Sequence, residues 1–136
     1  MRNARPVILL DTQVLLYDAF EPKRLSRKAR AALEDGMAAG ALACCDISLW
    51  EIALLAARRR IEAGPDIAAF IESVLQLRSV RVLPITPAIA TLAESDIFAH
   101  GDPADRLIAA TAIEHGAPLL TADAVLRNLK GLTAIW

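Results

Sequence analysis

The sequence predicts an α/β protein in which a central, mainly parallel sheet lies between two layers of helices, a three-layer, Rossmann-like architecture. Short apolar runs alternate along the chain with longer stretches of helical periodicity, and this alternation is typical of parallel strands joined by right-handed crossovers. The chain has 136 residues, a usual length for one domain. We therefore expect one domain over residues 1–136, with its ligand site beyond the carboxyl ends of the strands.

Two strands and three helices are expected in the first half of the chain. Residues 7–10 and 42–45 are apolar throughout, which is typical of strands buried on both faces. A helix is expected over about 26–40, because this stretch begins at a serine and ends at glycines, the residue types that favour helix starts and ends. The apolar spacing indicates further helices over 48–60 and 66–77.

The second half continues the same alternation. At 86–87 and at 102–103, a capping residue is followed by a proline, and this pair favours the first turn of a helix. The elements expected here are, in order, a strand over 80–83, helices over about 86–97 and 102–114, a strand over 118–121, a short helix after Asp123 and a strand over 132–136.

Composition excludes several classes of protein. Basic and acidic residues nearly balance, at 15 against 16, and 55% of the residues are hydrophobic, so a disordered chain is excluded. Charges or prolines interrupt the apolar runs well before the length of a membrane-spanning helix. Cys44 and Cys45 adjoin in an expected buried strand, so we expect two free thiols and a cytoplasmic protein. A net charge of −1 means that a bound metal, rather than a basic surface, would have to attract a polyanion.

Acidic residues gather where the expected strands end. The carboxyl ends of parallel strands share one edge of a sheet, which places Asp11, Asp46, Glu51 and Asp123 at that edge. The helix start at 102–105, with two further aspartates, would reach the same edge only if its loop brings it there. Crowded carboxylates raise one another's pKa, whereas a hard cation such as Mg²⁺ or Mn²⁺ makes their proximity favourable.

Most of these acids also have a purely structural interpretation. Glu51 can complete a capping box with Ser48, and Asp102 before a proline is an ordinary helix cap. Asp11 and Asp123 could cap the helices that follow them. Asp11 is the hardest to explain in this way, because a carboxylate after a fully apolar strand is costly unless it is paired or bound to a metal.

Four short motifs contain the acids. They read Leu9-Leu10-Asp11-Thr12, Ile47-Ser48-Leu49-Trp50-Glu51-Ile52, Asp102-Pro103-Ala104-Asp105-Arg106-Leu107-Ile108-Ala109 and Leu119-Leu120-Thr121-Ala122-Asp123. In this order and at this spacing, the sequence resembles the PIN-domain ribonucleases, and among them the VapC-type toxins of bacterial toxin–antitoxin pairs. The resemblance covers residues 7–136 and implies the PIN version of the three-layer fold.

The resemblance assigns roles to particular residues. It implies a catalytic metal site whose ligands are Asp11, Glu51, Asp105 and Asp123. The hydroxyl groups of Thr12 and Thr121 are implied to support these ligands. Asp102 has no ligand role in this match and remains a helix cap. Gln13 stands where many relatives carry His or Asn, a departure that leaves the four acids intact.

The resemblance also implies an activity and partners. The expected protein is a Mg²⁺- or Mn²⁺-dependent endoribonuclease that cleaves RNA with a metal-activated water. It is expected to be the toxin of a pair, neutralised by a VapB-like antitoxin, and a homodimer. A mean hydropathy of +0.40 is in keeping with exposed apolar surface for such partners.

Arg58 and Arg106 are the candidate substrate contacts. Arg58 follows Glu51 by seven residues and so shares its helical stripe, from which it could approach a phosphate. Arg106 could contact a phosphate or pair with a neighbouring acid. Trp50 and Trp136 are expected to be packing residues rather than platforms for RNA bases.

Other classes of function remain as alternatives. A receiver-like phosphoacceptor module also has acids at strand ends, but it needs an acid pair where this chain has Asp11 and Thr12, and a lysine after the last strand, whereas Lys130 precedes it. A phosphatase of the haloacid dehalogenase type is excluded by Gln13, which replaces its second aspartate. A catalytically inactive scaffold that only binds a partner would have no affinity for Mg²⁺.

Overall fold

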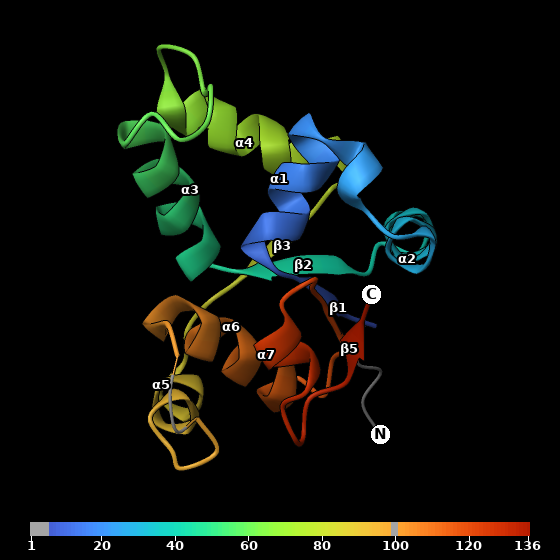
Figure 1. Ribbon diagram of the computed structural model, residues 1–136, viewed down its shortest axis with the longest axis vertical. Helices are drawn as coiled ribbons and strands as arrows, with labels where there is room; N and C mark the ends of the chain where they lie inside the picture. The colour runs from blue at the N-terminus through green and yellow to red at the C-terminus, as the bar shows by residue number, and fades with distance from the viewer. Residues whose placement is uncertain (1–5, 99–100) are drawn as a thin grey trace.

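Five short strands form one parallel sheet in the computed structural model, which describes residues 6–98 and 101–136 (Figure 1). The strands lie in the order β3-β2-β1-β4-β5, and every neighbouring pair is parallel. The predicted α/β fold is therefore confirmed, with β1, the strand that precedes Asp11, in the centre. The strands are β1 Ile8–Leu10, β2 Leu42–Cys45, β3 Arg81–Leu83, β4 Leu119–Leu120 and β5 Ala134–Ile135.

Helices connect the strands, and polar side chains begin several of them as predicted. Ser26, Asp66 and Thr86 each accept a hydrogen bond from the backbone N–H three residues further on, at 3.0, 3.0 and 3.2 Å, and such caps satisfy donors that have no partner inside the helix. The helices described are α1 Thr12–Phe20, the 3-10 turn Pro22–Arg24, α2 Arg27–Ala38, α3 Ile47–Ala57, α4 Ile67–Leu77, α5 Pro87–Ala93, α6 Pro103–Glu114 and α7 Ala124–Arg127.

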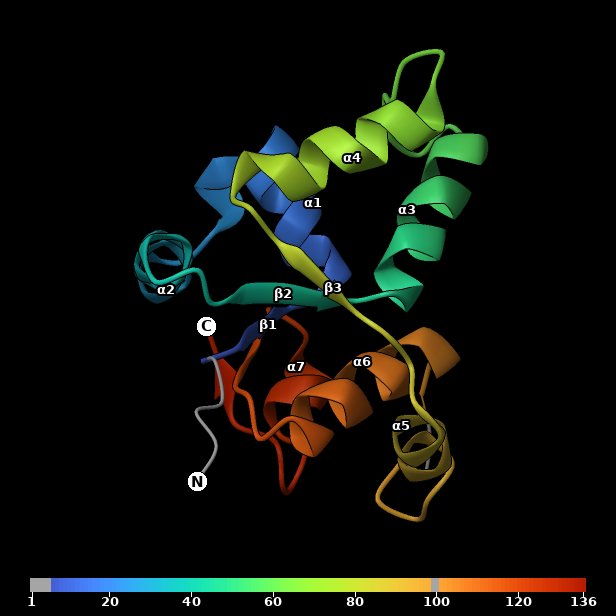
Figure 2. The same ribbon diagram turned by 180° about the vertical axis from the view of Figure 1, so that it is seen from behind.

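The sheet separates two helical layers, as Figures 1 and 2 show from opposite sides. Helices α1 to α4 cover one face, and α5 to α7 cover the other. Successive strand residues alternate between the two layers, since Leu10 and Cys44 belong to the core under α1 to α4, whereas Leu9 and Cys45 belong to the core under α6 and α7. This two-sided burial explains why β1, β2 and β4 are apolar at every position, whereas the outer strand β3 is less buried and includes Arg81.

Some elements differ from the sequence-based expectation. Helix α5 ends at Ala93 rather than near residue 97, and just beyond it the Ser95 hydroxyl donates to the carbonyl of Leu92 at 2.7 Å, a side-chain bond typical of chain that leaves a helix. Trp50 was expected to pack in the interior but is 56% exposed. Helix α3 begins at Ile47, and Trp50 lies on its outer side.

The two adjacent cysteines are free and buried, as predicted. Burial raises the pKa of the Cys44 thiol to about 12, so this sulfur stays protonated and unreactive. No helix in the described parts of the chain is long and apolar enough to cross a membrane.

Candidate active site

A cleft of about 480 Å³ opens beyond the carboxyl ends of β1 and β4, where the sheet topology predicts a ligand site. Both helical layers contribute to it, because α1 and α3 supply one wall while the start of α6 and the loop before α7 supply the other. Five of the lining side chains are carboxylates, and none in the described part of the chain is cationic. The residues that line the cleft are Asp11, Thr12, Gln13, Tyr17, Glu51, Leu54, Leu55, Asp102, Asp105, Ala122 and Asp123.

Asp11 is fixed at the base of the cleft by the central strand. Its backbone N–H donates to the Leu120 carbonyl at 3.0 Å, which extends the pairing of β1 with β4 by one residue. The Thr121 hydroxyl donates to Asp11 Oδ2 at 2.7 Å, and Asp11 is only 5% exposed. Burial raises the pKa of this carboxyl group, against the effect of the Thr121 hydrogen bond. Asp11 makes no side-chain cap to α1, so the structural explanation for it does not apply.

Glu51 is held by a hydroxyl pair rather than by its own helix. Helix α3 begins one residue before Ser48, so the capping box that the sequence allowed is not formed. Thr12 Oγ1 lies instead within hydrogen-bonding distance of Glu51 Oε1 and, at 2.8 Å, of Ser48 Oγ. A hydroxyl has one proton, so Thr12 donates to the carboxylate while Ser48 donates to Thr12. Burial is the main reason why the pKa of Glu51 is raised.

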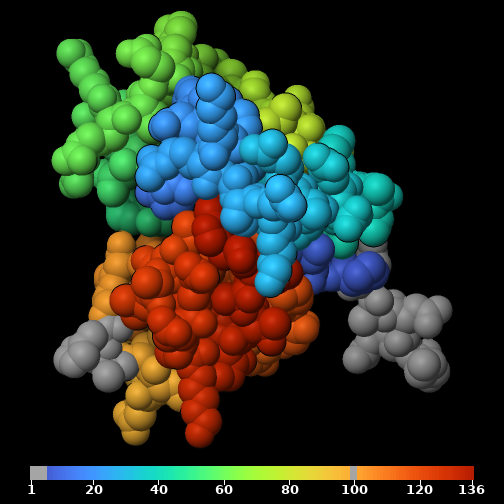
Figure 3. All heavy atoms as spheres, turned by 45° about the vertical axis from the view of Figure 1, so that its right-hand side comes forward, coloured from blue at the N-terminus to red at the C-terminus, as the bar shows by residue number. Residues whose placement is uncertain are grey.

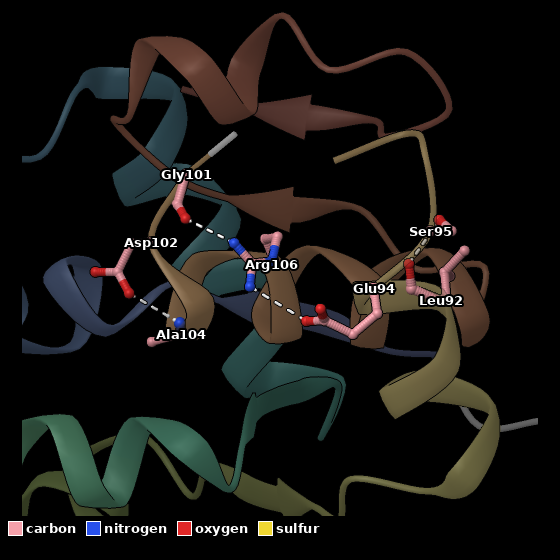
Figure 4. A network of polar contacts seen from close by, with 7 residues as sticks. All are labelled: Leu92, Glu94, Ser95, Gly101, Asp102, Ala104 and Arg106. Atoms are coloured by element: carbon pink, nitrogen blue, oxygen red, sulfur yellow. Dashed lines mark hydrogen bonds and ion pairs between the residues drawn. The ribbon is translucent and has the colours of Figure 1, made fainter. Parts of the chain in front are cut away.

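The start of α6 brings Asp102 and Asp105 to the cleft. Asp102 caps the helix as predicted, with Oδ1 accepting from the Ala104 N–H at 2.9 Å (Figure 4). One carboxylate oxygen from each of Glu51, Asp102 and Asp105 also lies within 4.8 Å of the other two. The interpretation of Asp102 as a cap alone was therefore incomplete. The signal available in the sequence was its spacing of three residues from Asp105, which puts both on one side of a helix start.

Asp123 and Thr121 complete the wall formed by the chain after β4. Asp123 Oδ1 accepts from the N–H groups of Val125 and Leu126 at 2.8 and 3.1 Å, which caps α7. The Thr121 hydroxyl oxygen also accepts from the Asp123 N–H at 3.1 Å. Thr121 thus connects two of the acids, because it donates to Asp11 and accepts from the backbone of Asp123.

Asp46 follows β2 at the same edge of the sheet but does not line the cleft. Its Oδ2 accepts from the Ile85 N–H at 3.2 Å, so the side chain is directed to the loop after β3. Asp46 was expected at this edge but not among the metal ligands, and its side chain does not enter the cleft, because a shared sheet edge does not fix the direction of a side chain.

The two candidate substrate contacts lie outside this cleft. Arg58 is exposed just after the end of α3. Arg106 Nη1 donates to the Gly101 carbonyl at 2.7 Å, and Nη2 pairs with Glu94 at 3.2 Å (Figure 4). Arg106 therefore joins the start of α6 to the end of α5. Of the two roles expected for Arg106, a phosphate contact or an ion pair with an acid, the structure contains the ion pair.

The acidic groups fit a hard divalent cation. Burial, followed by Asp11, Asp102, Asp123 and Glu51, raises the pKa of Asp105 to about 7, so proximity carries a clear electrostatic cost. Carboxylate oxygens are the ligands that Mg²⁺ and Mn²⁺ prefer. A cation placed among these groups would replace repulsion by attraction.

Comparison with known proteins agrees with this geometry. The PIN domain profile matches residues 8–132, nearly the whole chain. The chain belongs to the PIN-domain family. Among its PIN relatives, Ribonuclease VapC22 of Mycobacterium tuberculosis is 41% identical over 122 residues, which cover 89% of this chain and 90% of that protein. The resemblance to VapC-type PIN domains is confirmed.

Solved structures confirm the PIN fold independently. VapBC2 from Rickettsia felis, bound to a DNA fragment from its promoter, contains a chain with a TM-score of 0.68 and 17% identity, covering 94% of this PIN domain and 96% of that chain. VapBC-5 from Mycobacterium tuberculosis contains a chain with a TM-score of 0.60 and 20% identity, with coverage of 94% and 96%. At such low identity the likeness establishes the three-layer architecture alone.

The raised pKa of Asp105 predicts how the metal-free PIN domain responds to pH. Between the ordinary value of 3.8 and the folded value of about 7, the folded protein keeps a proton that the unfolded chain has released. Stability should therefore fall as the pH rises through this window. Asp105→Asn should reduce the slope, as measured by thermal unfolding in EDTA across the window.

Asp66→Asn provides the control for this pH experiment, because Asp66 also caps a helix but is exposed and does not line the cleft. It should keep the wild-type slope. An Asp105→Asn protein with an unchanged slope would show that Asp105 carries no such cost.

Proposed function

We propose that this PIN domain is a metal-dependent endoribonuclease and the toxin of a toxin–antitoxin pair. The observation that carries the proposal is the convergence of acids from β1, α3, α6 and the loop after β4 in one cleft whose described lining holds no cation. These acids stand at the positions of the PIN family's acidic motifs. The proposal is also supported by the 41% identity to a protein named as a ribonuclease.

Asp11, Glu51, Asp105 and Asp123 are the proposed metal ligands, and Asp102 adds a fifth carboxylate at the rim. Mg²⁺ or Mn²⁺, when bound, supplies activation of a water molecule and neutralisation of phosphate charge. The phosphodiester of an RNA strand is the proposed substrate.

The chain's own residues would prepare this centre by holding the carboxylates in place. Thr121 orients Asp11, while Thr12 orients Glu51. Asp123 uses one oxygen for the cap of α7 and keeps the other for the cleft. Because each carboxylate is fixed through groups on the sheet or on a helix start, little side-chain entropy is left to lose when a cation and a phosphate arrive.

The partners follow from the same family relationship. The solved relatives are named as VapBC complexes, and we infer that a VapB-like antitoxin neutralises this chain. We also propose a homodimer, for which large exposed apolar side chains such as Trp50 and Val125 offer contact surface. The receiver-like alternative has no support, because Lys130 is exposed and does not line the cleft.

The nuclease proposal predicts cleavage of total RNA that stops when EDTA removes divalent ions. Asp11→Asn should lower the cleavage rate at least about a hundredfold, since it removes a buried negative ligand, while the Asn oxygen can still accept from Thr121. Mapping and counting cut ends over time measures both effects.

Asp46→Asn is the matched control for this cleavage assay, because it neutralises an acid at the same sheet edge outside the cleft. It should leave cleavage unchanged. Cleavage that persists in EDTA, or in a folded Asp11→Asn protein, would contradict the proposed mechanism.

Asp102 is predicted to contribute to metal affinity beyond its role as a cap. Asn is as good a helix cap as Asp, so Asp102→Asn should not lower the melting temperature but should weaken Mn²⁺ binding roughly tenfold, as for other groups that support a metal site. Calorimetric titration measures this affinity. Asp66→Asn, which alters a cap away from the cleft, should bind Mn²⁺ as the wild type does. Equal Mn²⁺ affinities of the Asp102→Asn and Asp66→Asn proteins would show that Asp102 acts only as a helix cap.

A further inference from the structure

A second pocket, of about 370 Å³, lies beside the acidic cleft and has the opposite charge. Lys28 comes from the first turn of α2, and Arg127 is the last residue of α7. No carboxylate side chain of the described residues lines it. The lining residues are Lys28, Ala124, Arg127, Asn128, Ala134 and Trp136. We call this the basic pocket.

Lys28 and Arg127, the two exposed cations of the basic pocket, form no close ion pair in the described part of the chain. Among the described residues, the ion pairs within 4.0 Å are Arg78–Asp18 and Arg106–Glu94, and neither involves Lys28 or Arg127. Asn128 Nδ2 donates to the Ala124 carbonyl at 2.8 Å, so its amide is already engaged in the structure. Two unpaired cations around a concave surface favour an anionic ligand.

The basic pocket is lined by residues that adjoin those of the acidic cleft. Asp123 lines the cleft, and the next residue, Ala124, lines the pocket. Two aromatic rings also connect the two cavities. Tyr17 lines the cleft, Trp136 lines the pocket, and their ring centroids are 6.5 Å apart. Figure 3 shows the start of α2 in light blue against the C-terminal segments in red on one face of the molecule.

A third cation lies near the place where the cleft and the basic pocket adjoin. The Arg24 guanidinium lies over the Tyr17 ring, 4.4 Å from its centroid. Cationic groups interleaved with aromatic rings are the combination that binds single-stranded nucleic acid, because cations contact phosphates while the rings stack on bases. Trp136 lines the basic pocket and is only partly buried, while its ring packs beside Tyr17.

We propose that the basic pocket binds a phosphate of single-stranded RNA, next to the phosphodiester that is cut, and that Trp136 stacks on the adjoining base. The proposal rests on the proposed nuclease function and extends it to the path of the substrate. It explains how a chain of net charge −1 can hold a polyanion beside five carboxylates. Unpaired RNA is specified because a base must leave its stack to meet an aromatic ring.

Lys28→Gln/Arg127→Gln tests the pocket, and Arg27→Gln/Lys130→Gln is its matched control. Both double variants remove two positive charges, and all four residues are exposed, but Arg27 and Lys130 line none of the cavities described. Binding of a short single-stranded RNA is measured in EDTA, where cleavage stops. Melting temperatures verify that all proteins are folded.

The pocket variant should bind the RNA about fivefold or more weakly at low salt, and its plot of log affinity against log salt should be flatter by about 1.4, the slope expected for two lost contacts to a single strand. In Mg²⁺, its KM should rise while kcat stays near the wild-type value. The control should stay within about twofold of the wild type in affinity, because rim charges away from a contact contribute little.

Three outcomes would overturn the proposal. Equal losses in the two double variants would show that overall charge, not the pocket, attracts RNA. A pocket variant that binds and cuts like the wild type would overturn the pocket alone and leave the nuclease intact. A wild-type protein that neither binds nor cuts RNA would remove the proposed function together with the pocket.

Discussion

Repulsion among carboxylates at one edge of a parallel sheet is the constraint on which the rest of this structure depends. The group at its centre, Asp11, is 5% exposed and has a raised pKa because it is buried. A buried carboxylate is unfavourable unless it is paired or bound to a metal. The surrounding acids add to this cost, since burial and then the neighbouring carboxylates together raise the pKa of Asp105 to about 7. The fold must therefore hold the acids together against their own charges.

Two independent layers of the protein provide this restraint. Glu51 comes from the layer of α1 to α4, whereas Asp105 comes from the layer of α5 to α7, and each layer packs on its own face of the sheet. Hydroxyl groups then set the orientation, through Thr12 for Glu51 and Thr121 for Asp11. The acidic cluster consequently depends on the relative placement of the two layers, which the apolar strands between them determine. The packing of the core therefore determines the geometry of the acidic site.

The sequence was sufficient for the architecture because strand burial and helix caps are local signals. The apolar runs predicted β1 and β2, and Ser26, Asp66 and Thr86 marked helix starts correctly. Side-chain direction was not available in the same way. Asp46 and Asp11 both follow buried strands, yet only Asp11 enters the cleft, because Asp46 is drawn to the Ile85 N–H. The position of Asp102 also depended on a loop whose path no periodicity describes.

The most direct test of the account is the effect of Mg²⁺ on thermal stability at about pH 7.5, above the pKa of about 7 for Asp105. A ligand that binds only the folded state raises the melting temperature in a saturable manner. We expect this rise for the wild type but not for Asp11→Asn. Sodium at matched ionic strength should not produce the saturable rise in either protein. A melting temperature that Mg²⁺ leaves unchanged, or shifts equally in both proteins, would contradict the claim that a divalent cation relieves the repulsion at this site.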